Sequence, residues 1–127
     1  MIDHVSLRVS DLQRSRAFYD AALAPLGAAV RMEVSAREAG VAFLGYGPPE
    51  RPVFWIAQAP PATASGHVAF VAASRSDVDA FHKAALAAGG RDNGAPGLRA
   101  HYHPNYYGAF VLDPDGVNVE AVCHAPG

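Results

Sequence analysis

Cysteine is nearly absent from this sequence, because Cys123 is the only one among 127 residues. A single cysteine cannot form a disulfide within the chain, so the sequence gives no support for the cross-linked domains of oxidising compartments. No run of Lys or Arg occurs, and the formal net charge is −2. Nucleic acid binding needs a concentrated basic face, which this chain lacks.

Two further patterns are missing. No apolar stretch approaches the roughly 20 residues that a membrane-spanning helix needs. The first residues do not show a basic segment followed by an apolar one, which is the pattern of a secretory signal. These absences predict a cytoplasmic protein that binds neither nucleic acid nor membrane. The length fits a single domain, and a chain of this size can bury its own core.

What the sequence does contain is an internal duplication. His4-Val5-Ser6-Leu7 is matched 63 positions later by His67-Val68-Ala69-Phe70, and nine of twenty-four positions are identical from His4 to Gly27. Two copies are too few for a solenoid. We therefore expect one domain built from two repeats, at 4–59 and 67–124, joined by a short linker at 60–66.

The first copy begins with an alternation of apolar and polar residues over 3–9, which predicts a strand. A helix follows, with a capping pattern at 10–13, an irregular last turn at Pro25 and an end at Gly27. Three further strands are expected at 30–34, 41–46 and 53–58. The first copy thus reads β-α-β-β-β.

The second copy repeats this plan. We expect a strand at 67–72, a helix from about Ser74 to Gly89, a loop at 93–97, and strands at 98–103, 107–112 and 117–123. Asp113-Pro114-Asp115-Gly116 is typical of a tight turn between the last two strands. The sequence therefore predicts an α+β domain of two tandem βαβββ modules that share a core or pack side by side.

Strand alternation predicts where chemistry can occur. The less apolar face of each first strand should point away from its helix, and this face carries His4 in one copy and His67 in the other. In the last strand, Glu120 alternates onto the face that can look toward the same side. Two histidines and one carboxylate on three strands leave open coordination positions, which suits a divalent metal acting on a substrate or water.

A structural explanation competes with this one, because a lone strand histidine is usually not a ligand. Two histidines at equivalent repeat positions, together with an inward carboxylate, favour the metal site. Burying an unpaired carboxylate costs several kcal/mol, so Glu120 among valines should have a metal or a histidine as its partner. A hydrogen-bonded cluster without metal remains the third reading.

Several other side chains are candidates for substrate binding or proton transfer. Aligning Ala59-Pro60 with Ala125-Pro126 places Phe54 opposite Glu120. The substrate-binding candidates are Arg8 for an anionic group, Gln58 as an orienting amide, and an apolar pocket of Phe54, Ile56, Phe110 and Val122. The polar and aromatic stretch 101–107 offers general acid or base candidates, namely His101, His103 and Tyr106. The competing roles are a rim salt bridge for Arg8, plain core for the apolar residues and a dimer contact for 101–107.

Taken together, these features resemble the vicinal oxygen chelate superfamily, which holds glyoxalase I, extradiol dioxygenases, and fosfomycin- and bleomycin-resistance proteins. The resemblance rests on the paired modules, His4, His67 and the ending Asp113-Pro114-Asp115-Gly116-Val117-Asn118-Val119-Glu120. It implies a cup of curved mixed sheet with a divalent ion (Zn, Ni, Mn or Fe(II)) at its base, held by His4, His67 and Glu120. It also implies a homodimer whose sites can combine modules of both chains.

The departures from the family pattern narrow this expectation. The resemblance implies four metal ligands for glyoxalase I, one of them a second glutamate in the first copy. Phe54 stands at the position where this glutamate is expected. A three-residue site is therefore predicted, and glyoxalase I activity is disfavoured. Phe110 stands where the dioxygenase pattern has a tyrosine. Two hypotheses follow: a metal-dependent lyase, isomerase or dioxygenase acting on a small oxygen-chelating substrate, or a non-catalytic protein that sequesters a small molecule. Whether His4 meets its own His67 or that of a second copy is left open.

Overall fold

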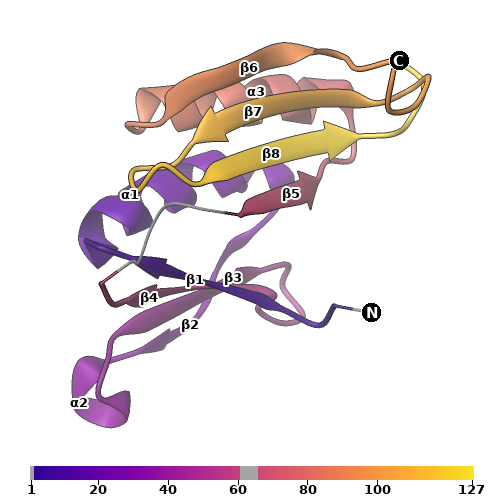
Figure 1. Ribbon diagram of the computed structural model, residues 1–127. Helices are drawn as coiled ribbons and strands as arrows, with labels where there is room; N and C mark the ends of the chain where they lie inside the picture. The colour runs from indigo at the N-terminus through magenta and orange to yellow at the C-terminus, as the bar shows by residue number, and fades with distance from the viewer. Residues whose placement is uncertain (1, 61–65) are drawn as a thin grey trace.

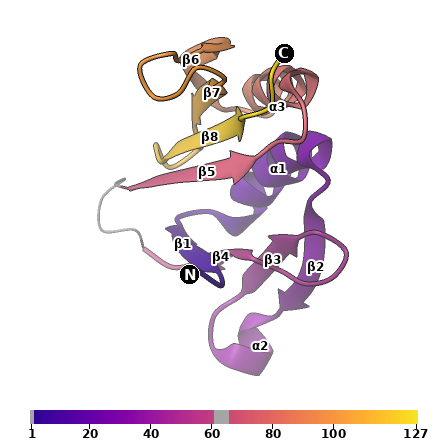
Figure 2. The ribbon, with the colours of Figure 1, turned by 90° about the vertical axis from the view of Figure 1, so that its right-hand side faces the viewer.

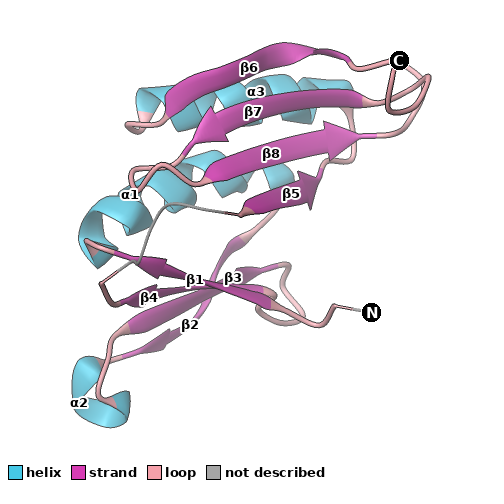
Figure 3. Cartoon of the chain, in the orientation of Figure 1, coloured by secondary structure: helices cyan, strands magenta, loops and turns pink. Residues whose placement is uncertain are grey.

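The computed structural model describes residues 2–60 and 66–127 (Figure 1; Figure 3), so most of the predicted linker at 60–66 lies outside the described residues. The first module consists of β1 (Val5–Val9), α1 (Leu12–Leu23), the 3-10 turn η1 (Ala24–Leu26), β2 (Ala29–Val34), α2 (Ala36–Ala39), β3 (Phe43–Gly47) and β4 (Phe54–Gln58). The second consists of β5 (His67–Val71), α3 (Arg75–Ala87), β6 (Arg91–Leu98), β7 (Tyr107–Leu112) and β8 (Asn118–Cys123).

Each module forms its own four-stranded mixed sheet. The strand orders are β1-β4-β3-β2 and β5-β8-β7-β6. The first and last strands of each module pair in parallel, and the other pairs are antiparallel. The prediction of two tandem βαβββ modules is confirmed. Within the described ranges the two sheets share no strand pair, so β1 and β5 are both edge strands.

The helix ends follow the local sequence. Asp11 caps α1 by accepting a hydrogen bond from the Arg14 N–H at 3.1 Å, one residue later than the predicted capping pattern begins. Pro25 cannot continue the α-helical hydrogen bonding, and the chain tightens into η1 before ending at Gly27 with φ of +79°. The expected irregular last turn is therefore confirmed.

Two local predictions were wrong. Residues 93–97 are not a loop but part of β6, and 98–103 is not a strand but mostly a turn. The register of β6 against β7 shifts twice around Gly94, so strand pairing continues through a segment whose glycines and proline suggested a loop. Helix α2 was not predicted, although Ser35 and Glu38 form a complete capping box at its start.

The core lies between the helices and the sheets. Helix α1 covers one face of the first sheet and α3 covers one face of the second, and the two helices contact each other (Figure 1; Figure 2). Phe54 of β4 and Phe70 of β5 meet edge to face across the modules, with ring centroids 5.0 Å apart. The uncovered sheet faces therefore lie on the outside. No helix within the described ranges is long and apolar enough to cross a membrane.

A buried hydrogen bond joins the two modules. The hydroxyl of Tyr19 on α1 donates to Oδ2 of Asp113, at the end of β7, over 2.6 Å, and both side chains are buried. The other oxygen of Asp113 accepts bonds from the backbone N–H groups of Asp115 and Val117, each at 2.9 Å. This carboxylate thus shapes the turn into β8 and fixes it to the first module.

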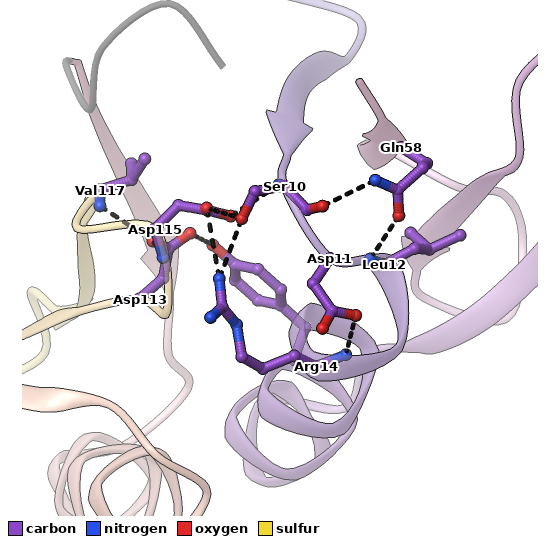
Figure 4. A network of polar contacts seen from close by, with 9 residues as sticks. Ser10, Asp11, Leu12, Arg14, Gln58, Asp113, Asp115 and Val117 are labelled. Atoms are coloured by element: carbon purple, nitrogen blue, oxygen red, sulfur yellow. Dashed lines mark hydrogen bonds and ion pairs between the residues drawn. The ribbon is translucent and has the colours of Figure 1, made fainter. Parts of the chain in front are cut away.

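Polar contacts at the surface extend this junction (Figure 4). Asp115 accepts hydrogen bonds from the backbone N–H and the hydroxyl of Ser10 and lies 3.4 Å from Arg14. The amide of Gln58 accepts a bond from Leu12 N–H and donates to the Ser10 carbonyl, both at 2.7 Å. The loop between β1 and α1 is therefore held both by β4 and by the turn of the second module.

The junction is not symmetric, although the sequence is duplicated. His82 stands on α3 at the repeat position of Tyr19. Its ring lies 3.0 Å from Asp92, in the same module. Among the described residues, His82 therefore makes no bond across the modules equivalent to that of Tyr19.

We predict that Tyr19→Phe lowers the free energy of unfolding by about 1–3 kcal/mol, because it leaves a buried carboxylate without one donor. Urea denaturation monitored by circular dichroism measures the change. Tyr107→Phe is the matched control, since its hydroxyl also donates to a carboxylate over 2.6 Å, but at the exposed Asp79. That variant should lose about 0.5 kcal/mol or less. Equal losses in both variants would contradict the importance of burial at the junction.

Stability should also fall at alkaline pH. Burial raises the pKa of Tyr19 well above its ordinary value, with further contributions from Asp113, and burial likewise raises the pKa of Tyr46, which donates to Asp20. Above about pH 10 the unfolded chain loses phenolic protons that the folded chain keeps, so each phenol lowers the unfolding free energy by about 1.4 kcal/mol per pH unit. Tyr19→Phe should have a shallower decline between pH 10 and 11 in urea denaturation, and an unchanged slope would count against this assignment.

Candidate metal centre

A histidine–carboxylate pair lies on the uncovered face of the second sheet. His67 opens β5, and Glu120 occupies the middle of β8, two residues beyond the strand partner of His67. The Nε2 atom of His67 lies 2.8 Å from Oε1 of Glu120. The Glu120 side chain is only 2 % exposed, whereas that of His67 is 41 % exposed. A buried carboxylate therefore meets a histidine that reaches solvent, as its need for a partner predicted.

The surroundings fix the orientation of this pair. The other ring nitrogen of His67 lies 3.1 Å from the Asn118 carbonyl, which can only accept a hydrogen bond. The Nδ1 atom must therefore carry a proton and donate it to this carbonyl. The Nε2 atom then has a lone pair, unless the ring holds a second proton that it shares with Glu120. A divalent cation can replace such a proton. Two atoms that ligate one ion at about 2.1 Å lie about 3.0 Å apart in octahedral and about 3.4 Å apart in tetrahedral geometry, so an ion would require the hydrogen-bonded pair at 2.8 Å to open slightly.

Tyr106 holds the other side of Glu120, because its hydroxyl donates to Oε2. Partial burial, together with the hydrogen bond to Glu120 and the negative charge there, raises the pKa of Tyr106 to about 12. The phenol consequently keeps its proton at neutral pH. Gly108 makes room for this contact, since a Cβ atom at that position would lie 3.1 Å from Oε2 of Glu120 and 3.2 Å from the Tyr106 ring.

An open groove of about 520 Å³ surrounds the pair, and its lining residues are His67, Tyr102, Tyr106, Phe110, Asn118 and Glu120. Phe110 stacks on the His67 ring at 5.9 Å with an interplanar angle of 25°. Phe110 was predicted to bind substrate, and the structure brings it to the candidate ligands. Val122 follows Glu120 on the same strand face and is buried.

His4 lies on the first sheet, apart from His67 and Glu120. It is exposed, bonds to Asp3 at 2.8 Å, and lines a separate groove of about 250 Å³ with Ser6, Phe43, Trp55 and Ala57. The two grooves have no residue in common. Within residues 2–60 and 66–127, no three His, Cys, Asp or Glu side chains are close enough together to hold a metal. One chain thus presents two ligands in one place and the third in another.

The predicted position opposite Glu120 was wrong by one residue. Ser6 pairs with Trp55 in the first sheet, and its repeat partner Ala69 pairs with Glu120 in the second. Trp55, and not Phe54, therefore occupies the place of Glu120. The error arose because the anchoring Ala-Pro pairs lie beyond the strands, where the two copies differ in length. The absence of a carboxylate at this position still holds.

Phe54 and Ile56 alternate onto the other face of β4 and belong to the core. Phe54 also lines an apolar cavity of about 330 Å³ at the module junction, together with Phe70, and not the His67 groove. Their expected place in a pocket beside Glu120 is therefore corrected. Both ends of the Gln58 amide form hydrogen bonds with backbone atoms of Ser10 and Leu12. This side chain therefore stabilises the loop between β1 and α1.

Of the remaining candidates, only Tyr106 lines one of the two grooves. Arg8 is exposed on the same strand face as His4. His101 stacks on Tyr102, with ring centroids 4.1 Å apart, and His103 meets His124 at 5.5 Å. Neither His101 nor His103 lines the His67 groove, whereas Tyr106 does. Proton transfer by these residues stays a prediction, and Tyr106 is the one that reaches a candidate ligand.

The fold and the site define a protein of paired βαβββ modules with a histidine–glutamate pair on one open sheet face. The sequence model of the Glyoxalase/Bleomycin resistance protein/Dioxygenase superfamily matches residues 1–121. The chain belongs to this superfamily. A comparison with curated proteins finds no match.

Solved structures give the same result. A glyoxalase/bleomycin resistance protein from Albidiferax ferrireducens T118 is 33 % identical, with a TM-score of 0.80 over 99 % of both chains. A glyoxalase/bleomycin resistance protein/dioxygenase family enzyme from Burkholderia phytofirmans PsJN is 18 % identical, with a TM-score of 0.69 over 97 % of this chain and 98 % of the other. Glyoxalase I from Zea mays is 23 % identical, with a TM-score of 0.69, over 95 % of this chain but 43 % of that one. The latter two likenesses concern the fold.

We predict that Gly108→Ala disturbs the Tyr106–Glu120 contact and lowers the free energy of unfolding by about 1–3 kcal/mol, because the new methyl group overpacks this site. Thermal unfolding and the near-ultraviolet circular dichroism of tyrosine measure the change. Gly97→Ala is the matched control, since Gly97 pairs with Gly108 and a Cβ there meets only the flexible end of Arg99 at 3.1 Å. If both variants behave alike, Gly108 has no special role beside Glu120.

Proposed function

We propose that the protein is a divalent-metal-dependent enzyme, of the lyase, isomerase or dioxygenase type, that acts on a small oxygen-chelating substrate. His67 and Glu120 of one copy and His4 of a second copy would hold the ion. The observation that carries this proposal is the buried Glu120 carboxylate 2.8 Å from the Nε2 atom of a solvent-accessible histidine. That pair supplies a hard oxygen and an imidazole, a donor set that suits Zn, Ni, Mn or Fe(II).

A second copy is part of the proposal because the ligands of one chain are divided. The helices pack between the modules, so the face with His4 and the face with His67 lie in different grooves. Both faces adjoin an edge strand, β1 in one module and β5 in the other. Unpaired strand edges favour pairing with another chain, and Val71 at the end of β5 is 78 % exposed. A two-fold dimer that joins these edges would complete two equal sites.

The residues around the pair have separable tasks. A divalent ion bound there would supply Lewis-acid polarisation of a substrate oxygen. The Asn118 carbonyl and the Phe110 ring orient His67. Tyr106 fixes one Glu120 oxygen and, with its raised pKa, carries a proton at neutral pH beside the groove. Because that proton is donated to Glu120, the task of Tyr106 is to hold the carboxylate in place for the ion.

The second hypothesis is a non-catalytic protein that sequesters a small molecule. One observation favours it: Trp55 replaces the carboxylate of the second module, so the first sheet offers an aromatic ring where a ligand could stand. Metal content separates the two hypotheses, because sequestration on an aromatic face needs no ion.

We predict that protein purified without chelator contains about one divalent ion per chain, and that His67→Ala and Glu120→Gln lose it, since each ligand is needed for a tight site. Inductively coupled plasma mass spectrometry measures the content, and thermal unfolding measures the stabilisation by added Zn²⁺. His101→Ala is the control, because that exposed ring does not line the groove. Absence of metal, together with no rise in melting temperature on adding Zn²⁺, Ni²⁺, Mn²⁺ or Fe²⁺, would rule out the enzyme hypothesis.

A mixing experiment tests whether two chains share the site. His4→Ala and His67→Ala chains carrying different affinity tags are co-expressed, and the heterodimer is isolated through both tags. In a shared arrangement one of its two sites has lost both histidines and the other is intact, so about one ion per heterodimer should bind. Failure to isolate a heterodimer, or a heterodimer as empty as the parent variants, would overturn the shared site.

A further inference from the structure

We propose that the uncovered face of the first sheet binds the body of the substrate, and that the substrates are planar conjugated or aromatic anions. This inference rests on the proposed function and deepens it, because it keeps the ion between His67, Glu120 and the His4 of a second copy and assigns the rest of the substrate to the first sheet beyond His4. It depends on side chains that one chain brings together, namely Trp55 and Arg8 with Phe43, Ser6 and Ala57 beside them.

Trp55 forms a platform on this face. Gly45 is its strand partner on β3, and a Cβ atom at Gly45 would lie 2.7 Å from the six-membered ring of the indole. The indole therefore lies across the bare backbone of Gly45, where any side chain would collide with it. Phe43 supports it edge to face, with ring centroids 5.6 Å apart. A ring held in this way keeps part of its surface toward the groove that it lines with His4.

Such a platform selects a flat partner. Aromatic and conjugated systems gain from stacking or edge-to-face contact beyond the burial of their area, whereas aliphatic groups gain only the burial. Phe43 and His4 line the groove together with the indole, and the small residues Ser6 and Ala57 leave space beside it. A thin ligand can therefore lie along the sheet.

Arg8 supplies the charge. It follows His4 and Ser6 on the same face of β1, and its strand partner is Ala57, two residues beyond Trp55. Among the described residues the Arg8 side chain has no hydrogen bond or ion pair, whereas Arg14, Arg16 and Arg51 each have a carboxylate partner. A rim salt bridge within the chain is thus not its role. An exposed guanidinium beside an aromatic platform suits a planar carboxylate, which it can bind through two parallel hydrogen bonds.

The order along the strand sets the shape of the ligand. Residues on one strand face recur about every 6.6 Å, so the sequence of His4, Ser6 and Arg8 places the candidate metal ligand and the cation at opposite ends with Trp55 between them. A fitting molecule has chelating oxygens at one end, a flat body in the middle and an acid group at the far end.

Trp55 is the only tryptophan in the sequence, so its indole N–H gives a single resonance that reports on this face. We predict that cinnamate, added to metal-free protein labelled with ¹⁵N, shifts this resonance in a saturable way. Cinnamamide, which has the ring without the charge, should bind about tenfold more weakly. The saturated analogue 3-cyclohexylpropanoate, which keeps the charge without the flat body, should bind about three- to tenfold more weakly.

The variant Arg8→Gln separates an anchoring role from a general effect of charge. It should weaken cinnamate binding about tenfold and leave cinnamamide unchanged. Arg37→Gln removes the same charge from α2 and should leave both ligands unaffected. The spectrum of each variant shows directly whether it is folded. The inference is overturned if the indole resonance does not respond to cinnamate, if cinnamate and 3-cyclohexylpropanoate bind equally well, or if both arginine variants behave alike.

These outcomes are independent of the metal, because the titration uses metal-free protein. If metal content and heterodimer mixing behave as proposed while the indole does not respond, the substrate class is wrong and the metal site stands. If the indole responds as predicted and the chain binds no metal, the enzyme hypothesis fails and the ligand face stands.

Discussion

The hydrogen bond between Tyr19 and Asp113 is the constraint on which the arrangement of the molecule depends. A buried carboxylate must be satisfied, and this one has three donors, two from its own turn and one from the helix of the other module. The bond runs from α1 to the end of β7 and adds to the packing of α1 against α3 in the interior. With the helices inside, His4 and His67 line different grooves on the uncovered sheet faces. The division of the candidate site is a result of this packing.

That division explains how a duplicated unit can carry unequal halves. Glu120 and Trp55 occupy equivalent positions, but one is a buried carboxylate tied to His67 and Tyr106, and the other is an indole lying over Gly45. A carboxylate at Trp55 would need its own donors on a face where Ser6, Phe43 and Ala57 provide few. The first module therefore presents an apolar surface with His4 and Arg8 at its margin, while the second presents the carboxylate.

Much of the fold was readable from the sequence, because strand alternation, helix caps and the repeated His-Val opening are local signals. The pairing of His67 with Glu120 followed from strand parity. The identity of the residue equivalent to Glu120 did not, because the Ala-Pro pairs used for alignment lie outside the strands and the intervening loops differ in length. Only the register of β1 against β4 reveals Trp55. Likewise, the bulges of β6 let a glycine-rich segment pair as a strand, and the separation of His4 from His67 depends on helix packing that no local pattern records.

The one-sided junction has a consequence for how this chain can change over time. Because His82 stands where Tyr19 would recur and bonds within its own module, the buried bond between the modules forms only at the turn of the second module. That turn leads directly into β8 and Glu120. The buried junction and the candidate ligand Glu120 therefore lie within one short stretch, 113–120. A substitution there can alter the stability of the fold and the candidate site together.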